Sequence, residues 1–121
     1  MSAAQHLARA RALVHAGLPL PADLGAELLR LADDSMPAAL VRIERDRHLC
    51  AAGQCVGGSV YAQAKAIQTE ASVLLRVWPR LVADPPPPAD LRGHTFAALL
   101  ASPQRRIPRQ RRLLEILQRA A

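Results

Sequence analysis

Apolar residues recur at helical intervals along most of this chain, most clearly between Ser59 and Pro79. Their spacings there are four, three, four, three and four positions, and the residues are Val60, Ala64, Ile67, Ala71, Leu74 and Trp78. This periodicity predicts one long amphipathic helix, because such spacings place side chains on one face. Ser59 would cap the helix and Pro79 would end it. Ile67, Leu74 and Trp78 are the positions expected deepest in the core.

The same pattern predicts five further helices, at about 3–16, 22–33, 37–52, 90–101 and 108–121. Ser2 and Gln5 have the spacing of a capping box, and Gly17 supplies a stop for the first helix. Asp34 or Ser35 would cap the third, and Gly53 and Gly57-Gly58 would break the chain after it. We expect no strand.

We therefore expect an all-α protein, a single compact domain of five to six helices over residues 1–121. The run Asp84-Pro-Pro-Pro-Pro88 predicts a semi-rigid, unpacked spacer over 84–89. A basic helical segment, 90–121, would follow it, starting at an Asp90 cap and including a first-turn proline at Pro108.

Charge is distributed unevenly along the chain. Residues 1–58 hold six basic and six acidic residues, whereas residues 59–121 hold ten basic and four acidic, so the net charge of +6 lies in the second half. Such an asymmetry is typical of a surface that binds polyanions. Composition offers an alternative, because fifteen arginines against one lysine also fit a GC-rich genome.

Clustering of the arginines favours the functional interpretation. Five of them fall within eight residues, at Arg105, Arg106, Arg109, Arg111 and Arg112. They flank the expected start of the last helix, where the unpaired N–H groups repel cations and acidic residues are usual. An external anion such as a phosphate would compensate for this placement. We expect these five residues to form the main nucleic-acid contact.

A second candidate contact lies at the start of the long helix. Residues 47–67 resemble a helix-turn-helix unit within 42–78, with small Ala51 and Ala52 at the helix crossing and Gly57-Gly58 in the turn. The resemblance implies that the first exposed residues of the second helix enter the DNA major groove. These would be Ser59, Tyr61, Gln63, Lys65 and Gln68. An ordinary helix pair in an α-bundle explains the same residues.

Sequence motifs for catalysis and metal binding are missing. Gly53-Gln-Cys-Val-Gly-Gly-Ser59 lacks the lysine of a phosphate loop. Cys50, Cys55 and His48 have no second ligand pair at zinc-finger spacing, which favours free thiols. We expect no enzyme activity, no cofactor and no metal. The N-terminus lacks a signal-peptide core and no apolar run is long enough to span a membrane, so a cytoplasmic protein is expected.

These features favour a small DNA-binding regulatory or accessory protein, with DNA preferred over RNA as the partner. The regular apolar face of the long helix could also pair with the same face of a second copy, so a homodimer is a possible state of the protein. The alternative is a non-catalytic helical subunit, adaptor or phage-encoded inhibitor in a nucleoprotein complex such as a CRISPR effector. That comparison rests on size, charge and helix content alone. An acidic protein could also pair with the arginines.

Overall fold

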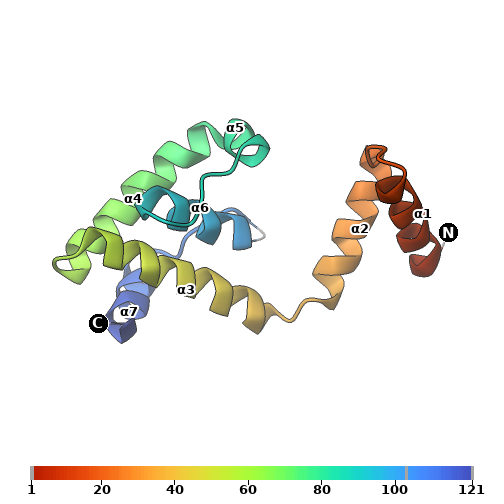
Figure 1. Cartoon of the computed structure of the whole chain (residues 1–121). Coiled ribbons are helices and arrows are strands. Elements are labelled where there is room, and N and C mark those ends of the chain that lie inside the picture. The colour runs from red at the N-terminus through yellow and green to blue at the C-terminus, as the bar shows by residue number, and fades with distance from the viewer. Residues whose placement is uncertain (1, 103, 121) are drawn as a thin grey trace. The chain divides into compact units, whose positions relative to one another are not determined.

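The computed structural model describes residues 2–102 and 104–120, and over those residues the protein is all-α, with seven helices and no strand. The all-α prediction is confirmed. Figure 1 shows the helices in chain order: α1 (Ala3–His15), α2 (Ala22–Ser35), α3 (Ala38–Val56), α4 (Val60–Arg76), α5 (Trp78–Ala83), α6 (Leu91–Ala101) and α7 (Gln110–Ala120).

The chain divides into two compact units, Met1–Pro37 and Ala38–Ala121. We call them the hairpin unit and the core unit. A single domain over 1–121 therefore stays a prediction.

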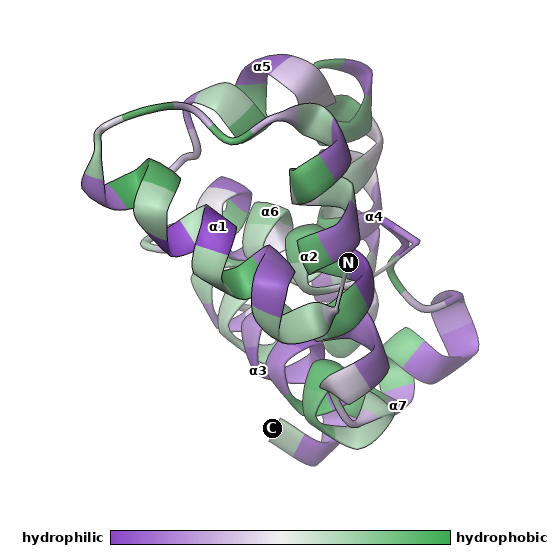
Figure 2. Ribbon diagram, turned by 90° about the vertical axis from the view of Figure 1, so that its right-hand side faces the viewer, coloured by the Kyte–Doolittle hydropathy of each residue, from purple (hydrophilic) through white to green (hydrophobic). Residues whose placement is uncertain are grey.

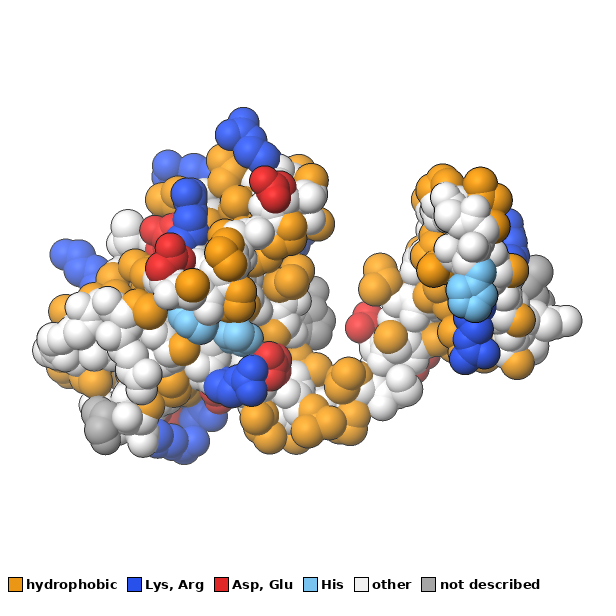
Figure 3. Space-filling model, in the orientation of Figure 1, with side chains coloured by type: hydrophobic (Ala, Val, Ile, Leu, Met, Phe, Trp, Pro, Cys, Tyr) orange, Lys and Arg blue, Asp and Glu red, His pale blue; other side chains and the backbone are white. Residues whose placement is uncertain are grey.

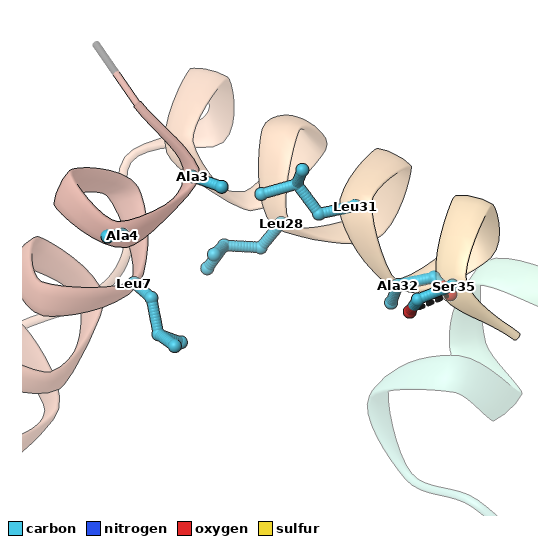
Figure 4. Close-up of a pocket in the computed structure, with 7 residues that line it drawn as sticks. All are labelled: Ala3, Ala4, Leu7, Leu28, Leu31, Ala32 and Ser35. Carbon is cyan, nitrogen blue, oxygen red and sulfur yellow. Dashed lines mark hydrogen bonds between the residues drawn. The ribbon is translucent and has the colours of Figure 1, made fainter.

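The hairpin unit consists of α1 and α2 packed against each other. The predicted capping box is present: Gln5 N donates to Ser2 Oγ at 3.2 Å, and Ser2 N donates to Gln5 Oε1 at 2.7 Å. Gly17 ends α1 with a left-handed φ of 70°. Ala10 and Leu24 are buried. Between the helices runs a largely apolar groove (Figure 4), lined by Ala3, Ala4, Leu7, Leu28, Leu31, Ala32 and Ser35.

In the core unit, α6 lies between α3 and α4, and α7 packs on the same two helices (Figure 1). Small residues allow the close approach, since Ala52, Ala64 and Ala98 are almost completely buried. Around them one apolar cluster gathers from α3, α4, α6 and α7, including Leu49, Ile67, Leu113, Ile116 and Leu117.

A second apolar cluster joins α4, α5 and α6 through Ala71, Leu74, Trp78, Phe96 and Leu99. The rings of Trp78 and Phe96 lie 5.1 Å apart, centroid to centroid. The three residues expected deepest on the long helix are indeed buried, with exposed fractions of 0% for Ile67 and Leu74 and 8% for Trp78.

Several predicted boundaries are wrong for identifiable reasons. Asp34 and Ser35 belong to the last turns of α2 instead of capping α3. Gly53 does not break the chain: it lies inside α3, buried against Gln63 and Leu117, where a larger side chain would collide. The turn comes at Gly57 and Gly58, whose φ angles of 72° and 74° favour glycine.

The remaining differences concern proline and the helix ends. Pro79 lies in the first turn of a short separate helix, so Trp78 begins α5 and does not belong to α4. Pro108 precedes the last helix, because α7 begins at Gln110 and Arg109 O accepts the hydrogen bond from Leu113 N at 2.9 Å. Figure 2 shows hydrophobic and hydrophilic residues alternating along α7. The buried residues of α7 are Leu113, Ile116 and Leu117.

The proline run between α5 and α6 is without helix, as expected, but it is not an unpacked spacer. Pro87 O lies so close to the Gly93 backbone that a Cβ built on Gly93 would stand 1.8 Å from it. Asp90 caps α6 as predicted, its Oδ1 accepting from Gly93 N at 2.8 Å. The spacer therefore lies directly against the first turn of α6.

Leu99 and Leu100 test the central position of α6 as a matched pair of neighbours. Leu99 is 0% exposed and Leu100 is 56% exposed. Leu99→Ala should lower the free energy of unfolding by about 2–5 kcal/mol, because it opens a cavity in the second cluster. Leu100→Ala should change it by less than about 1 kcal/mol. Urea unfolding followed by circular dichroism measures both, and equal effects would contradict the packing.

Gly93→Ala tests the contact between the proline run and α6. Alanine normally favours a helix interior by about 1 kcal/mol over glycine. Here the new methyl group would collide with backbone, which cannot rotate away as a side chain can. We expect a net loss of stability in urea unfolding, whereas Gly25→Ala, in open space on α2, should stabilise or leave the protein unchanged.

Candidate nucleic-acid interface

The five clustered arginines are all exposed and occupy the connection from α6 to α7 and the first turn of α7. They are held by different parts of the fold. Arg105 and Arg106 lie on the connection, Arg109 is the residue before α7, and Arg111 and Arg112 stand on its first turn. The cluster predicted from the sequence is therefore a surface feature, and we call these residues the arginine cluster.

Arg105 has a backbone conformation that is unusual for a residue with a side chain. Its φ is 52°, and its N–H donates to Ser102 O at 3.0 Å. Left-handed backbone costs about 1 kcal/mol or more outside glycine, so surrounding structure must hold it. The Arg105 guanidinium carbon lies 6.0 Å from the Trp78 ring centroid, at the outer limit of a cation–π contact.

Ile107 fixes the same connection from within. Its half-buried side chain packs against both apolar clusters of the core unit. An apolar anchor between Arg106 and Pro108 holds the neighbouring arginines at the surface. Arg106 N also donates to Ser102 Oγ at 3.4 Å. The arginines of this connection thus start from a tethered backbone, which lowers the entropic cost of binding an anion.

A shallow pocket of about 310 Å³ joins this connection to α4. Its apolar floor includes Ala71, Leu99 and Ile107, and its polar lining includes Gln68, Ser72, Arg105 and Arg106. The structure thus brings Gln68 together with two members of the arginine cluster, although they lie almost forty residues apart in the sequence.

Tyr61, Lys65 and Gln68 share a stripe of α4 with Ser72 and Leu75, at spacings of four, three, four and three. Tyr61 is 64% exposed and Lys65 is also exposed. The C-terminal end of this stripe lines the pocket beside Arg105 and Arg106. We call these five residues of α4 the α4 stripe, and it meets the arginine connection at this pocket.

Two of the predicted contact residues already have internal roles. Ser59 caps α4, its Oγ accepting from Ala62 N at 3.2 Å. Gln63 Nε2 donates to Gly58 O at 3.1 Å, and its Oε1 lies over Gly53 of α3. Contact of Gln63 with a base stays a prediction, and it would require breaking the bond to Gly58.

Arg111 and Arg112 are partly neutralised by one carboxylate. Glu115 lies 3.9 Å from Arg111 Nε and 3.2 Å from Arg112 Nη1. Such exposed pairs contribute little to stability and exchange readily with an external anion. For Arg105, Arg106 and Arg109, no ion pair with an Asp or Glu forms within 2–102 and 104–120. These three are the stronger candidates for phosphate contacts.

The cysteines and histidine of α3 do not assemble into a nucleophile and base. His48 Nε2 contacts Glu44 Oε1, and its Nδ1 faces His94. Cys50 Sγ points to Ile116 O at 3.6 Å on the α7 side. Burial, and secondarily the Asp46 carboxylate, raise the pKa of the Cys50 thiol, which keeps it protonated and unreactive. Both thiols are free.

Comparisons of this protein with known protein families, with curated proteins and with solved structures give no match. Over the described part of the chain, no helix has the length and apolar character needed to cross a membrane.

Sequence patterns missed the residues that hold the site in place. Ile107 anchors the arginine connection, and Trp78 lies near the Arg105 guanidinium. Ser102 accepts hydrogen bonds from the backbone N–H groups of Arg105 and Arg106. A single isoleucine among five arginines was the one visible signal. Trp78 carried no such signal, because its approach to Arg105 depends on how α5 and α6 pack.

Gln63→Ala should act on folding more than on binding. The variant loses the hydrogen bond to Gly58 in an exposed turn, so we expect a loss of about 0.5–1.5 kcal/mol in unfolding free energy. Nucleic-acid affinity should change less than threefold. Urea unfolding and fluorescence anisotropy with labelled DNA measure the two effects. Unchanged stability together with loss of preference for one base position would instead assign Gln63 to base readout.

Proposed function

We propose that this protein binds nucleic acid through the arginine cluster and the α4 stripe, as a cytoplasmic, non-catalytic DNA-binding regulatory or accessory protein. The observation that carries the proposal is the joining of Gln68, Arg105 and Arg106 around one pocket, at the end of a stripe with exposed Lys65 and Tyr61. Phosphates supply most of the affinity in such complexes, and arginine is well suited to contact them.

Electrostatics support the same surface. Arg105, Arg106 and Arg109 have no carboxylate partner in the described residues. Arg109 directly precedes α7, where helix N–H groups add positive potential. Arg111 and Arg112 can exchange Glu115 for phosphate at small cost. Figure 3 shows further Lys and Arg side chains spread over the core unit.

A more specific form of this proposal is that α3 and α4 act as a helix-turn-helix unit that binds DNA. The Gly57-Gly58 turn supports it, and Tyr61, Lys65 and Gln68 would then face the DNA. The engagement of Gln63 and Ser59 within the protein leaves few groups free for base readout. Contact mainly with the phosphate backbone would suit the alternative function, a subunit, adaptor or phage-encoded inhibitor in a nucleoprotein complex.

Replacing Arg105, Arg106 and Arg109 by alanine tests the proposal. If each contacts one phosphate, the slope of log affinity against log salt should become shallower by about 2.7 on duplex DNA. Affinity at low salt should fall by at least tenfold. Anisotropy titrations on preferred, random and single-stranded probes, and on RNA, measure the change and separate base reading from backbone binding.

A matched control removes three arginines elsewhere, at Arg9, Arg11 and Arg42, which are exposed. Net charge falls equally in both variants, so a loss confined to the first identifies the location of the site. Circular dichroism should show both folded. Equal losses of nucleic-acid affinity in both variants would show that only the overall charge matters. Unchanged affinity in the variant of Arg105, Arg106 and Arg109 would refute the proposed site. Binding to polyglutamate but not to DNA or RNA would favour an acidic protein partner.

A further inference from the structure

The two helices of the hairpin unit bury little of their apolar surface against each other. Helices α1 and α2 hold 13 and 14 residues, and helices of about 12–15 residues need tertiary packing to be stable in water. Among the described residues of this unit, only Ala10 and Leu24 are buried. Large apolar side chains are instead exposed, at Leu7, Val14, Leu18, Leu20, Leu29 and Met36. Figure 3 shows hydrophobic side chains spread over the surface of the hairpin unit.

Both helices have the apolar spacing of a helix bundle. Apolar residues recur at intervals of three or four positions, at Leu7, Ala10 and Val14 in α1 and at Leu24, Leu28 and Leu31 in α2. Core positions of helix bundles recur in this way. Leu7 and Leu28 lie on opposite sides of the groove between the helices (Figure 4), which has a volume of about 370 Å³. Two helices of a second hairpin would cover this groove and complete a four-helix core.

Charge beside the groove favours a second copy of the same hairpin as the partner. Helix α1 contains no acidic residue, whereas α2 contains four acidic residues and one arginine. Arg11 lies one turn after Leu7 on the same face of α1, and Asp33 directly follows Ala32 of the groove lining. Both charged residues are exposed, and neither forms an ion pair with another residue of the described chain. One hairpin therefore carries both halves of a complementary charge pattern.

The two charges lie toward opposite ends of the hairpin. His6 Nε2 is 4.0 Å from Glu27 Oε1, which places these two residues at the same level of the helix pair. Arg11 lies from there toward the connection between the helices and Asp33 toward the other end, so about 16 Å of helix length separates them. They are too far apart to pair within one hairpin. A two-fold axis perpendicular to the helices places the opposite ends of two hairpins together, and Arg11 of each chain then meets Asp33 of the other.

We propose that the hairpin unit binds a second copy of this chain, with the groove of one copy packed on the groove of the other across a two-fold axis. The two hairpins form an antiparallel four-helix bundle, with Leu7 and Leu28 in its core and two ion pairs between Arg11 and Asp33 at its edges. The apolar face of α4 takes no part in this contact, because it is already buried in the core unit. Formation of the dimer does not depend on the proposed binding of nucleic acid, which uses the core unit.

Sedimentation velocity of the full chain, without nucleic acid, tests the proposal. As the concentration rises through the micromolar range, the mass should increase from that of one chain to that of two. Leu7→Glu places an unpaired charge in the core of the bundle and should raise the dimer Kd by at least about a hundredfold. Leu100→Glu is the matched control, because Leu7 and Leu100 are 46% and 56% exposed and Leu100 lies on α6 of the core unit. The control should keep the wild-type Kd.

A charge exchange at exposed positions tests the arrangement of the two copies without disturbing the fold. Arg11→Asp and Asp33→Arg should each raise the dimer Kd by about tenfold, because like charges then meet at two symmetric places. The double variant Arg11→Asp/Asp33→Arg should return the Kd to the wild-type value. Arg9→Asp changes the net charge as Arg11→Asp does, but on a different face of α1, and should have no effect.

Three results would overturn the proposal. The first is a chain that stays monomeric at every concentration, and a lower melting temperature of monomeric Leu7→Glu would then assign the groove to a contact within one chain. The second is a control variant, Leu100→Glu or Arg9→Asp, that weakens the dimer as much as its matched variant does. The third is a double variant that does not recover, which would exclude the pairing of Arg11 with Asp33 across the two-fold axis.

Discussion

Burial of α6 between α3 and α4 is the constraint on which the rest of the core unit depends. The helices approach closely because alanines stand at their crossings, with Ala52, Ala64 and Ala98 almost free of solvent contact. Helices that approach through small residues leave no room for a larger side chain. Larger apolar residues then fill the space on both sides, in two clusters connected by Ile107.

That packing also determines where the arginines stand. The chain leaves α6 at Ala101, turns at Ser102 and enters the core again at Ile107, so Arg105 and Arg106 are held between two fixed points. Arg105, on this connection, has a positive φ of 52°. A cation on such a tethered loop loses less conformational entropy when it meets a phosphate than one on a free tail would.

The same helix crossing brings His48 to His94, on a surface that the α4 stripe does not share. The proposed nucleic-acid interface uses α4, the connection from α6 to α7 and the start of α7, whereas the histidine contact joins α3 to α6.

The sequence by itself determined the helical class and the main elements. The hydrophobic period and the capping residues located α1, α4 and α6. The buried face of α4 followed from residue spacing alone, because helical hydrogen bonds and side-chain periodicity depend on residues that are close in the sequence. It also identified the arginine cluster as an exposed cationic segment. Gly53 was misread because a glycine that breaks a helix and one that admits a neighbouring helix look alike without the neighbour.

Only the tertiary structure decided which distant residues meet. Gln68 and Arg106 line one pocket from different parts of the chain. Gln63 meets Gly53, Pro87 meets Gly93 and His48 meets His94. No spacing along the chain encodes them, since they depend on how the helices cross and on which side chains leave room for the approach. The sequence therefore gives the residues able to bind an anion, and the packing decides which of them lie together.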